Sequence, residues 1–261
     1  MPATTSVLFL HGMYLNAASW QPWVERAAAA GLVGHAISWP FHDGQPAERR
    51  TAIDPGLGHL TFGDVVAFCK QHIDSLPERP HLIGHSIGGL VVQKLVNDGY
   101  AASGVGVSPA PARGILSLSP HFLPANFPHI NPFAGNRPVV MTAKRFRYTF
   151  GNTMSAADSD ALFEQFVVPE SRNVPRSTLT SQAAVDFARP HVPLRFLTGD
   201  DDHLTPLDAV RRNARAYRRG GPDAEVEVQV FPGRCHAICH QDGWQEVADA
   251  AFAFVVANGA G

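Results

Sequence analysis

A serine flanked by glycines is the strongest chemical signal in the sequence. Residues 84–88 read Gly-His-Ser-Ile-Gly, after an apolar run and before a further glycine and an apolar helical stretch. This order is typical of a serine on a sharp turn between a strand and a helix, where bulky neighbours would not fit. At the helix N-terminus, free N–H groups and the helix dipole favour developing negative charge. Ser86 is therefore the candidate nucleophile, and the alternative is a chance glycine-rich turn.

A serine hydroxyl is a poor nucleophile until a base takes its proton, and histidine is the usual base. His236 follows the apolar run at 226–230 and a Pro-Gly turn, and it precedes the last helical stretch. His240 is the nearest competitor, but His236 comes first after the turn. We therefore predict that His236 is the base; a surface histidine is the alternative.

The acid that orients the base should follow the preceding apolar run, at 194–198. Three consecutive aspartates compete there, and Asp202 is the one in the pattern Gly-x-x-Asp-x-x-x-Pro. A buried carboxylate at this position would hold the imidazole in its productive tautomer. Asp200 or Asp201 would instead cap the following turn. The run before that ends in Val-Ser-Pro at 107–109, with no carboxylate, which also favours Asp202.

The reaction would also need two backbone N–H groups that converge on one oxygen. One should belong to Ile87, the residue after the nucleophile. The other should come from the loop after the first apolar run, which reads Leu-His-Gly-Met at 10–13. Met13 is the expected donor, because the glycine before it lets the backbone approach a substrate closely.

These residues must be held by a regular alternation of strands and helices. Short apolar runs suit strands buried on both faces of a parallel sheet, and helical patterns lie between them. The alternation predicts a doubly wound, mostly parallel α/β sheet. The expected strands are 7–10, 33–39, 81–84, 104–107, 194–198 and 226–230, and the expected helices are 20–30, 62–76, 90–96, 206–219 and 245–256.

One stretch interrupts the alternation. Residues 109–190 are rich in proline and aromatic residues, show no strand rhythm, and are partly helical in pattern at 148–168. Their aromatic content argues against a disordered linker. We predict a helical lid at 109–190 inserted into a core formed by 1–108 and 191–261. Aromatic lid residues would line a pocket for a substrate with apolar parts, and the candidate substrate-binding residues are Tyr14, Trp39 and His121.

Composition narrows the class of protein. The chain has 261 residues, 45% of them hydrophobic, and a formal net charge of -2, so no basic field indicates nucleic acid or an anionic membrane as partner. No segment has the length of a membrane span. Three cysteines, and an N-terminus without the features of a signal peptide, favour a reducing, cytoplasmic location. The oligomeric state stays open, with a homodimer among the alternatives.

Two further clusters are interpreted as structural. Residues 235–240 read Cys-His-Ala-Ile-Cys-His, but this is not the spacing of a zinc site, so no metal is predicted. Five arginines between 211 and 219 are expected to form a solvated face. His85, beside the nucleophile, is expected to point away from it and to pack.

Taken in order, these motifs resemble the α/β-hydrolase superfamily: His-Gly before the oxyanion loop, Gly-His-Ser-Ile-Gly-Gly at 84–89, the acid at 202 and the base at 236. The resemblance covers nearly the whole chain apart from the lid. It implies a Ser–His–Asp triad, no cofactor, and a lid between the sixth and seventh core strands. There are two departures: the His-Gly strand comes first in the sequence, so we expect the first two strands of larger members to be missing, and the loop at 40–44 lacks their Asp-x-x-Gly-x-Gly form.

The sequence therefore predicts a serine hydrolase that cleaves a small-molecule carboxylic ester, lactone or thioester through an acyl-enzyme on Ser86. Two alternatives remain. The same triad could perform hydroxynitrile lyase or perhydrolase chemistry, for which the lid offers the cations Lys144, Arg145 and Arg147. The chain could also be a ligand-binding relative that has lost turnover.

Overall fold

Six parallel strands form one sheet at the centre of the computed structural model, which describes residues 5–221 and 226–259. Their order in the sheet is β2-β1-β3-β4-β5-β6, and each neighbouring pair is parallel. The predicted parallel α/β fold is thus confirmed, and the outermost ends of the predicted core, residues 1–4 and 260–261, lie outside the described residues. The strands are β1 (Ser6–Leu10), β2 (Val33–Ile37), β3 (His81–His85), β4 (Ser103–Val107), β5 (Leu194–Gly199) and β6 (Val226–Phe231).

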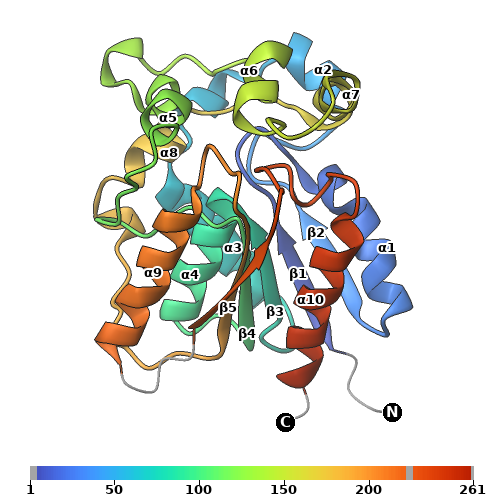
Figure 1. Cartoon of the computed structure of the whole chain (residues 1–261), viewed down its shortest axis with the longest axis vertical. Helices are drawn as coiled ribbons and strands as arrows, with labels where there is room; N and C mark the ends of the chain where they lie inside the picture. The colour runs from blue at the N-terminus through green and yellow to red at the C-terminus, as the bar shows by residue number, and fades with distance from the viewer. Residues whose placement is uncertain (1–4, 222–225, 260–261) are drawn as a thin grey trace.

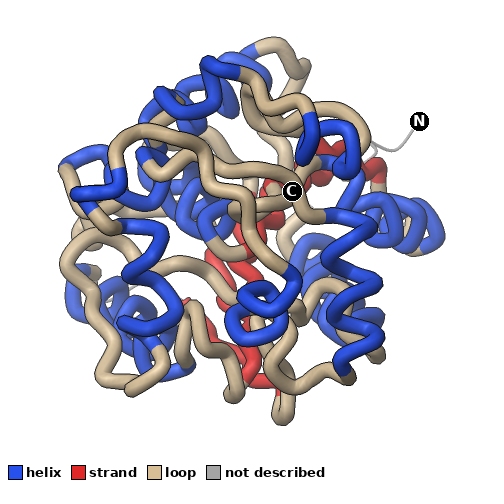
Figure 2. The backbone as a smooth tube through the Cα atoms, turned by 90° about the horizontal axis from the view of Figure 1, so that it is seen from above, coloured by secondary structure: helices blue, strands red, loops and turns tan. Residues whose placement is uncertain are grey.

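Helices cover both faces of this sheet (Figures 1 and 2). Helices α1 (Gln21–Ala29) and α10 (Trp244–Ala257) lie on one face, and α3 (Phe62–Asp74), α4 (Ile87–Asn97) and α9 (Leu207–Gly220) on the other. The apolar side chains divide accordingly into two clusters, one on each side of the sheet. None of the helices in the described ranges has the length and apolar character needed to cross a membrane.

The two edge strands differ from the expectation of burial on both faces. β3 and β4 are buried along their whole length. The edge strands differ: β2 has no fully buried residue, and β6 is buried only at its two ends and alternates between partly buried and exposed residues in the middle. Helix boundaries also differ slightly: α4 begins at Ile87, directly after the elbow serine, and Pro206 precedes α9 rather than opening it. Helix α2 (Pro46–Thr51) was not predicted, since it is short and polar and shows no apolar periodicity.

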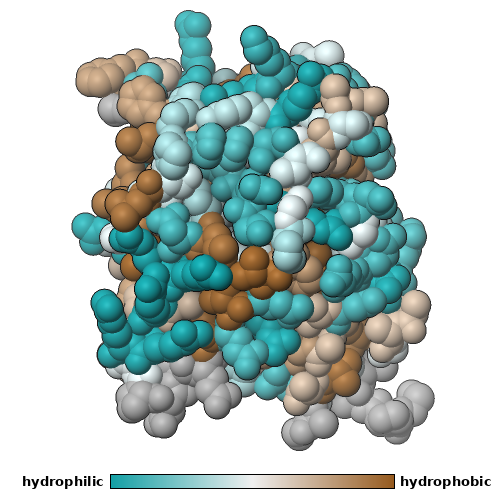
Figure 3. Space-filling model, viewed as in Figure 1, coloured by the Kyte–Doolittle hydropathy of each residue, from teal (hydrophilic) through white to brown (hydrophobic). Residues whose placement is uncertain are grey.

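The chain between β4 and β5 forms a separate layer over the carboxyl end of the sheet (Figure 1). It contains α5 (Phe122–Ile130), α6 (Ala143–Thr149), α7 (Ala156–Phe166) and α8 (Asn173–Ser177). We call residues 108–193 the inserted segment; its action as a lid stays a prediction. Apolar residues are exposed on the side of the molecule that carries α5 and α8 (Figure 3). They include Leu116, Leu118, Leu123 and Phe127.

The strand order sets the place of the site. After β1 the chain runs to the edge strand β2, and it then returns to form β3 on the other side of β1. The loops after β1 and β3 therefore leave the sheet in opposite directions and open a crevice between them. In open parallel sheets, such a switch point at the carboxyl ends of the strands is where ligands bind.

Candidate active site

The turn after β3 holds Ser86 in a strained conformation. Its φ of 56° and ψ of -120° lie in a region that residues with side chains seldom adopt. Both glycines of the motif are required by close approach: a Cβ on Gly84 would lie 2.3 Å from the carbonyl oxygen of Gly88, and one on Gly88 would lie 2.3 Å from that of Leu10. The close packing expected from the sequence is therefore present, and it holds Ser86 on the sharp turn directly before α4.

The structure brings Ser86, His236 and Asp202 into one hydrogen-bonded array. Ser86 Oγ lies 2.8 Å from Nε2 of His236, and Nδ1 of the same ring lies 2.7 Å from Oδ2 of Asp202. All three residues are buried. The competitor His240 instead bonds through Nε2 to the carbonyl of Ser19, so it is not available to the serine.

Asp202 is held by more than the imidazole. Its Oδ1 accepts the backbone N–H groups of Leu204 and Thr205 at 2.8 and 2.9 Å, and the Thr205 hydroxyl lies 2.8 Å from Oδ2. Burial alone would raise the pKa of this carboxyl, but His236 and these donors lower it to about 2. Asp200 and Asp201 are exposed, and Asp200 accepts the N–H of Gly233 as a turn residue. Asp202 is thus the ionised acid of the array.

The loop after β1 packs directly on this turn. A Cβ on Gly12 would lie 3.0 Å from Ser86 Cβ and 3.0 Å from Nδ1 of His85, so any larger residue would press on the nucleophile and its neighbour. Met13 and Ile87 both line the cavity that contains Ser86. Among the described residues, neither of their N–H groups has a hydrogen-bond partner. The two predicted oxyanion donors therefore line the same cavity as the serine, and their N–H groups are unused in the described structure.

Comparison with known proteins decides the family. The family model described as "Alpha/beta hydrolase family" matches residues 7–250, which is most of the chain. The chain belongs to the α/β hydrolase family. The comparison with curated proteins finds no match.

Solved structures with this fold resemble the α/β hydrolase chain over almost its whole length. A monoacylglycerol lipase of Paleococcus ferrophilus is 20% identical, with a TM-score of 0.70 over 98% of this chain and 96% of its own. A pyrethroid hydrolase from Sphingobium faniae JZ-2 is 19% identical, with a TM-score of 0.68 over 98% of each chain. Polyneuridine aldehyde esterase is 16% identical, with a TM-score of 0.69 over 97% of this chain and 99% of its own. At these identities the likeness shows the fold alone.

In this α/β hydrolase, the inserted segment is hydrogen-bonded to Tyr14, in the loop that follows β1. The Tyr14 N–H donates to Oε2 of Glu170 at 3.1 Å, and its carbonyl accepts the N–H of Val168 at 2.8 Å. Its hydroxyl lies 2.6 Å from Nδ1 of His129 on α5. Tyr14 also has a positive φ of 65°. Three contacts from one segment therefore hold a strained residue next to Met13.

The Glu170 side chain that accepts the Tyr14 N–H also belongs to a buried ion pair. The Glu170 carboxylate faces Nε2 of His42 at 3.2 Å, and both side chains are fully buried. Burial alone would lower the pKa of His42, but the charge and hydrogen bond of Glu170 raise it. Sequence reasoning missed both residues. The one available signal for Glu170 was a lone acid directly after the Val-Val-Pro run at 167–169.

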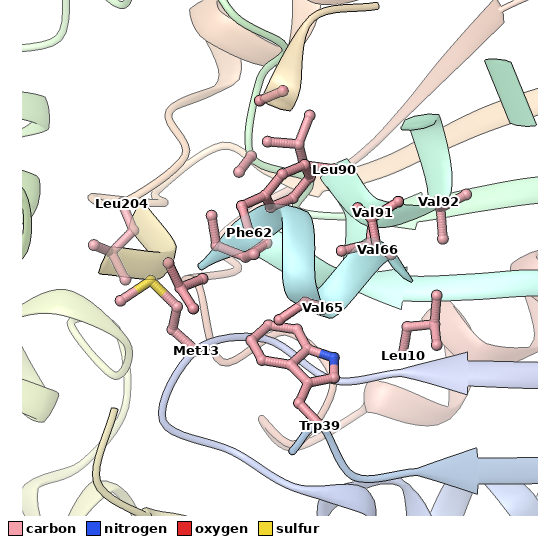
Figure 4. Packing of buried hydrophobic residues seen from close by; sticks show 14 of the residues in the cluster. Leu10, Met13, Trp39, Phe62, Val65, Val66, Leu90, Val91, Val92 and Leu204 are labelled. Atoms are coloured by element: carbon pink, nitrogen blue, oxygen red, sulfur yellow. The ribbon is translucent and has the colours of Figure 1, made fainter. Parts of the chain in front are cut away.

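The cavity beside Ser86 receives only some of the predicted substrate-binding residues. Tyr14 lines this cavity of about 230 Å³, but Trp39 and His121 do not. Trp39 packs on His11, with ring centroids 4.2 Å apart, and lies in the same buried apolar cluster as Val65 (Figure 4). His121 stacks on the ring of His203 at 4.0 Å. Both rings are held by other side chains, so sequence position alone misplaced them.

His85 points away from the serine, as expected, but it does more than pack. Its Nε2 donates to the carbonyl of His236 at 2.8 Å and so braces the loop of the base. Burial, together with the neighbouring His236, holds the pKa of His85 well below its usual range, so the ring stays neutral. This contact joins residues 151 positions apart in the sequence, so no local sequence pattern predicts it.

The remaining candidates from the sequence have other partners. Cys235 bonds to Gln241, and no group of three or more potential metal ligands occurs among the described residues. Of the three lid cations, Arg145 bonds to carbonyls of α5 and Arg147 pairs with Asp160. None of the three, Lys144 included, lines the cavity in the described part of the chain. The cation that a lyase would need near its leaving group is therefore not supplied by these residues.

Proposed function

We propose that this protein is a serine hydrolase that cleaves a small-molecule carboxylic ester through an acyl-enzyme on Ser86. The observation that carries the proposal is the continuous array from Asp202 through His236 to Ser86, with contacts of 2.7 and 2.8 Å. Its serine lines an apolar cavity together with Met13 and Ile87, whose N–H groups are unused in the described structure. The family, and the lipase and esterase names among its structural neighbours, support the same chemistry.

The proposed mechanism gives each of these groups a role. His236 Nδ1–H donates to the Asp202 carboxylate, so Nε2 is free to take the proton of Ser86 as Oγ attacks the ester carbonyl. The N–H groups of Met13 and Ile87 bind the oxyanion. The protonated His236 then gives its proton to the leaving alkoxide. Water activated by the same ring releases the acid and restores the serine.

The cavity indicates which part of the substrate is apolar. Its wall combines Met13 and Leu204 of the core with Phe150 and other side chains of the inserted segment. Phe150 also packs edge-on against His236, with ring centroids 4.9 Å apart. An alkyl or aryl group fits such a wall better than a charged one.

Intact mass after treatment with a fluorophosphonate tests the activated serine without knowledge of the substrate. Wild type should gain one adduct, and Ser86→Ala should gain none. Ser108→Ala is the matched control, because Ser108 is a buried serine near the elbow with an unpartnered hydroxyl in the described structure. It should be labelled like wild type. Wild type should then hydrolyse short-chain nitrophenyl esters, and Ser86→Ala and His236→Ala should not.

Two results would contradict the proposal. An adduct that persists in Ser86→Ala would place the reactive serine elsewhere. A folded wild type that takes no adduct and binds esters without product would favour a ligand-binding relative that has lost turnover, and ligand-induced thermal stabilisation would then identify its ligand.

A further inference from the structure

The cavity beside Ser86 is apolar except for a few side chains whose polar atoms can be followed one by one. Asn126 donates its amide to the carbonyls of Phe122 and Leu204, so its N–H groups are occupied. The hydroxyl of Thr178 donates to the carbonyl of Pro175. Arg113 is exposed and bonds through Nε to a backbone carbonyl. These groups are committed to the protein or turned to solvent.

His129 is different. It lines the same cavity from α5, it is 5% exposed, and its Nε2 is buried with no hydrogen-bond partner among the described residues. Buried polar atoms are almost always paired in native proteins, because an unpaired donor loses its bonds to water and gains nothing in return. An unpaired ring nitrogen in the wall of a substrate cavity therefore calls for a partner that the chain itself does not provide.

The Tyr14 hydroxyl determines what kind of partner fits. Its one hydrogen-bond partner in the described structure is Nδ1 of His129, at 2.6 Å. If Nδ1 carried the ring hydrogen, the hydroxyl hydrogen of a buried tyrosine would have no acceptor. With the hydroxyl as donor to Nδ1, both groups are satisfied, and the ring hydrogen must be on Nε2.

The ring is also held neutral. Burial, with Arg145 and Arg172 nearby, lowers the pKa of His129 to about 4. Burial and the Glu170 charge raise the pKa of Tyr14 well above its usual value, so the hydroxyl keeps its proton. His129 therefore has the same tautomer across the neutral pH range, with a single N–H donor on Nε2.

We propose that the Nε2–H of His129 is a specificity-determining donor that binds an oxygen of the substrate inside the apolar cavity. The substrate class is an ester whose buried chain carries an acceptor oxygen, as ether, carbonyl or hydroxyl, at one position along it. A plain hydrocarbon chain would leave the donor unpaired. The inference rests on the proposed ester hydrolysis and adds the feature by which one ester is chosen over another.

The test is a scan of substrate pairs. The two nitrophenyl esters of a pair have equal chain length and differ at one position, where one carries a methylene and the other an ether oxygen; successive pairs move this position along the chain. Each kcat/KM is divided by the rate constant for hydrolysis of the same ester by hydroxide, which removes differences in intrinsic reactivity. Wild type should prefer the oxygen at one position by roughly three- to tenfold, the value of one neutral hydrogen bond. His129→Phe should lose that preference. Because the preference is a ratio between paired esters in one variant, a general loss of rate from the broken Tyr14 contact does not change how it is read.

Two further variants supply an alternative test and a control. Tyr14→Phe leaves the ring in place but removes the donor that selects its tautomer, so the preference for the ether oxygen should shrink; it serves in place of His129→Phe if that variant does not fold. Thr178→Val is the matched control, because it removes a lining hydroxyl that already bonds to the chain. It should keep the wild-type preference.

The outcomes separate this inference from the function on which it rests. Adduct formation and ester hydrolysis without an oxygen preference at any position would overturn the inference alone. A preference that survives in His129→Phe would do the same. A wild type that takes no fluorophosphonate adduct would overturn the proposed function and this inference together.

Discussion

Replacing Asp202 by asparagine should invert the tautomer of His236. In the wild-type structure Oδ1 accepts two backbone N–H groups, while Oδ2 faces Nδ1 of the ring at 2.7 Å. The amide of the variant has one acceptor atom, and the two backbone donors of Leu204 and Thr205 claim it. The amide nitrogen must then occupy the Oδ2 position and donate to Nδ1, which places the ring hydrogen on Nε2, opposite Ser86.

The expected loss follows from that geometry. With Nε2 protonated, His236 cannot accept the serine proton, and this tautomer costs about a thousand- to ten-thousand-fold in kcat. The corresponding increase in the activation free energy is about 4 to 5.5 kcal/mol. KM should change little, because Asp202 lies outside the cavity lining.

Steady-state hydrolysis of a nitrophenyl ester measures the loss, and nitrogen-15 NMR of His236 reports which ring nitrogen carries hydrogen. Asp201→Asn is the matched control: this neighbour is exposed and should stay near wild-type rates. An Asp202→Asn enzyme within tenfold of wild type would refute the argument, as would an equal loss in Asp201→Asn. Thermal unfolding of both variants shows whether the fold is retained.

Three other perturbations test the frame of the site. Glu170→Gln should reduce the free energy of unfolding in urea by on the order of 3 kcal/mol, because buried His42 would lose its counter-charge. Folding raises the pKa of His42, so the stability from this pair should be complete below the unfolded pKa of about 6.5 and decline as pH rises through the folded value. Urea unfolding of wild type and His42→Gln between pH 6 and 9 tests this: a difference in unfolding free energy that stays constant over this range would contradict it. Gly88→Ala should abolish fluorophosphonate labelling, because its Cβ would lie 2.3 Å from the Leu10 oxygen, and normal labelling would contradict the close packing of β1 against the elbow. Cys69, Cys235 and Cys239 are all buried, and burial raises the pKa of each thiol, so the native protein should not react with a thiol reagent at pH 8. Rapid reaction before unfolding would contradict this.

The sequence predicted the fold and the three residues of the array because each signal is local. The strands are short and rich in apolar residues, with polar residues alternating in the edge strand β6, and Ser86, Asp202 and His236 each follow a strand within a few residues. In a parallel sheet all these ends lie at one edge. Local pattern plus topology therefore suffices to bring together side chains 150 residues apart.

The pocket could not be predicted in the same way, because the inserted segment has no repeating geometry. Trp39 and His121 were chosen for type and approximate position, yet their rings pack on His11 and His203. His129 was not considered, although it lines the cavity. Its place depends on the path of an irregular chain over the sheet, which apolar periodicity does not encode.

The contacts of Tyr14 also change how the inserted segment should be regarded. A lid that only opens and closes would touch the core through side chains that part easily, whereas this segment bonds to the N–H, the carbonyl and the hydroxyl of one residue. That residue has a positive φ and directly follows Met13, the proposed oxyanion donor. A strained backbone persists only where its surroundings hold it. Residues 167–171 and His129 of α5 therefore belong to the frame of the oxyanion loop, and an opening movement is to be sought in parts of the segment outside these contacts, such as the exposed residues Leu116 and Leu118.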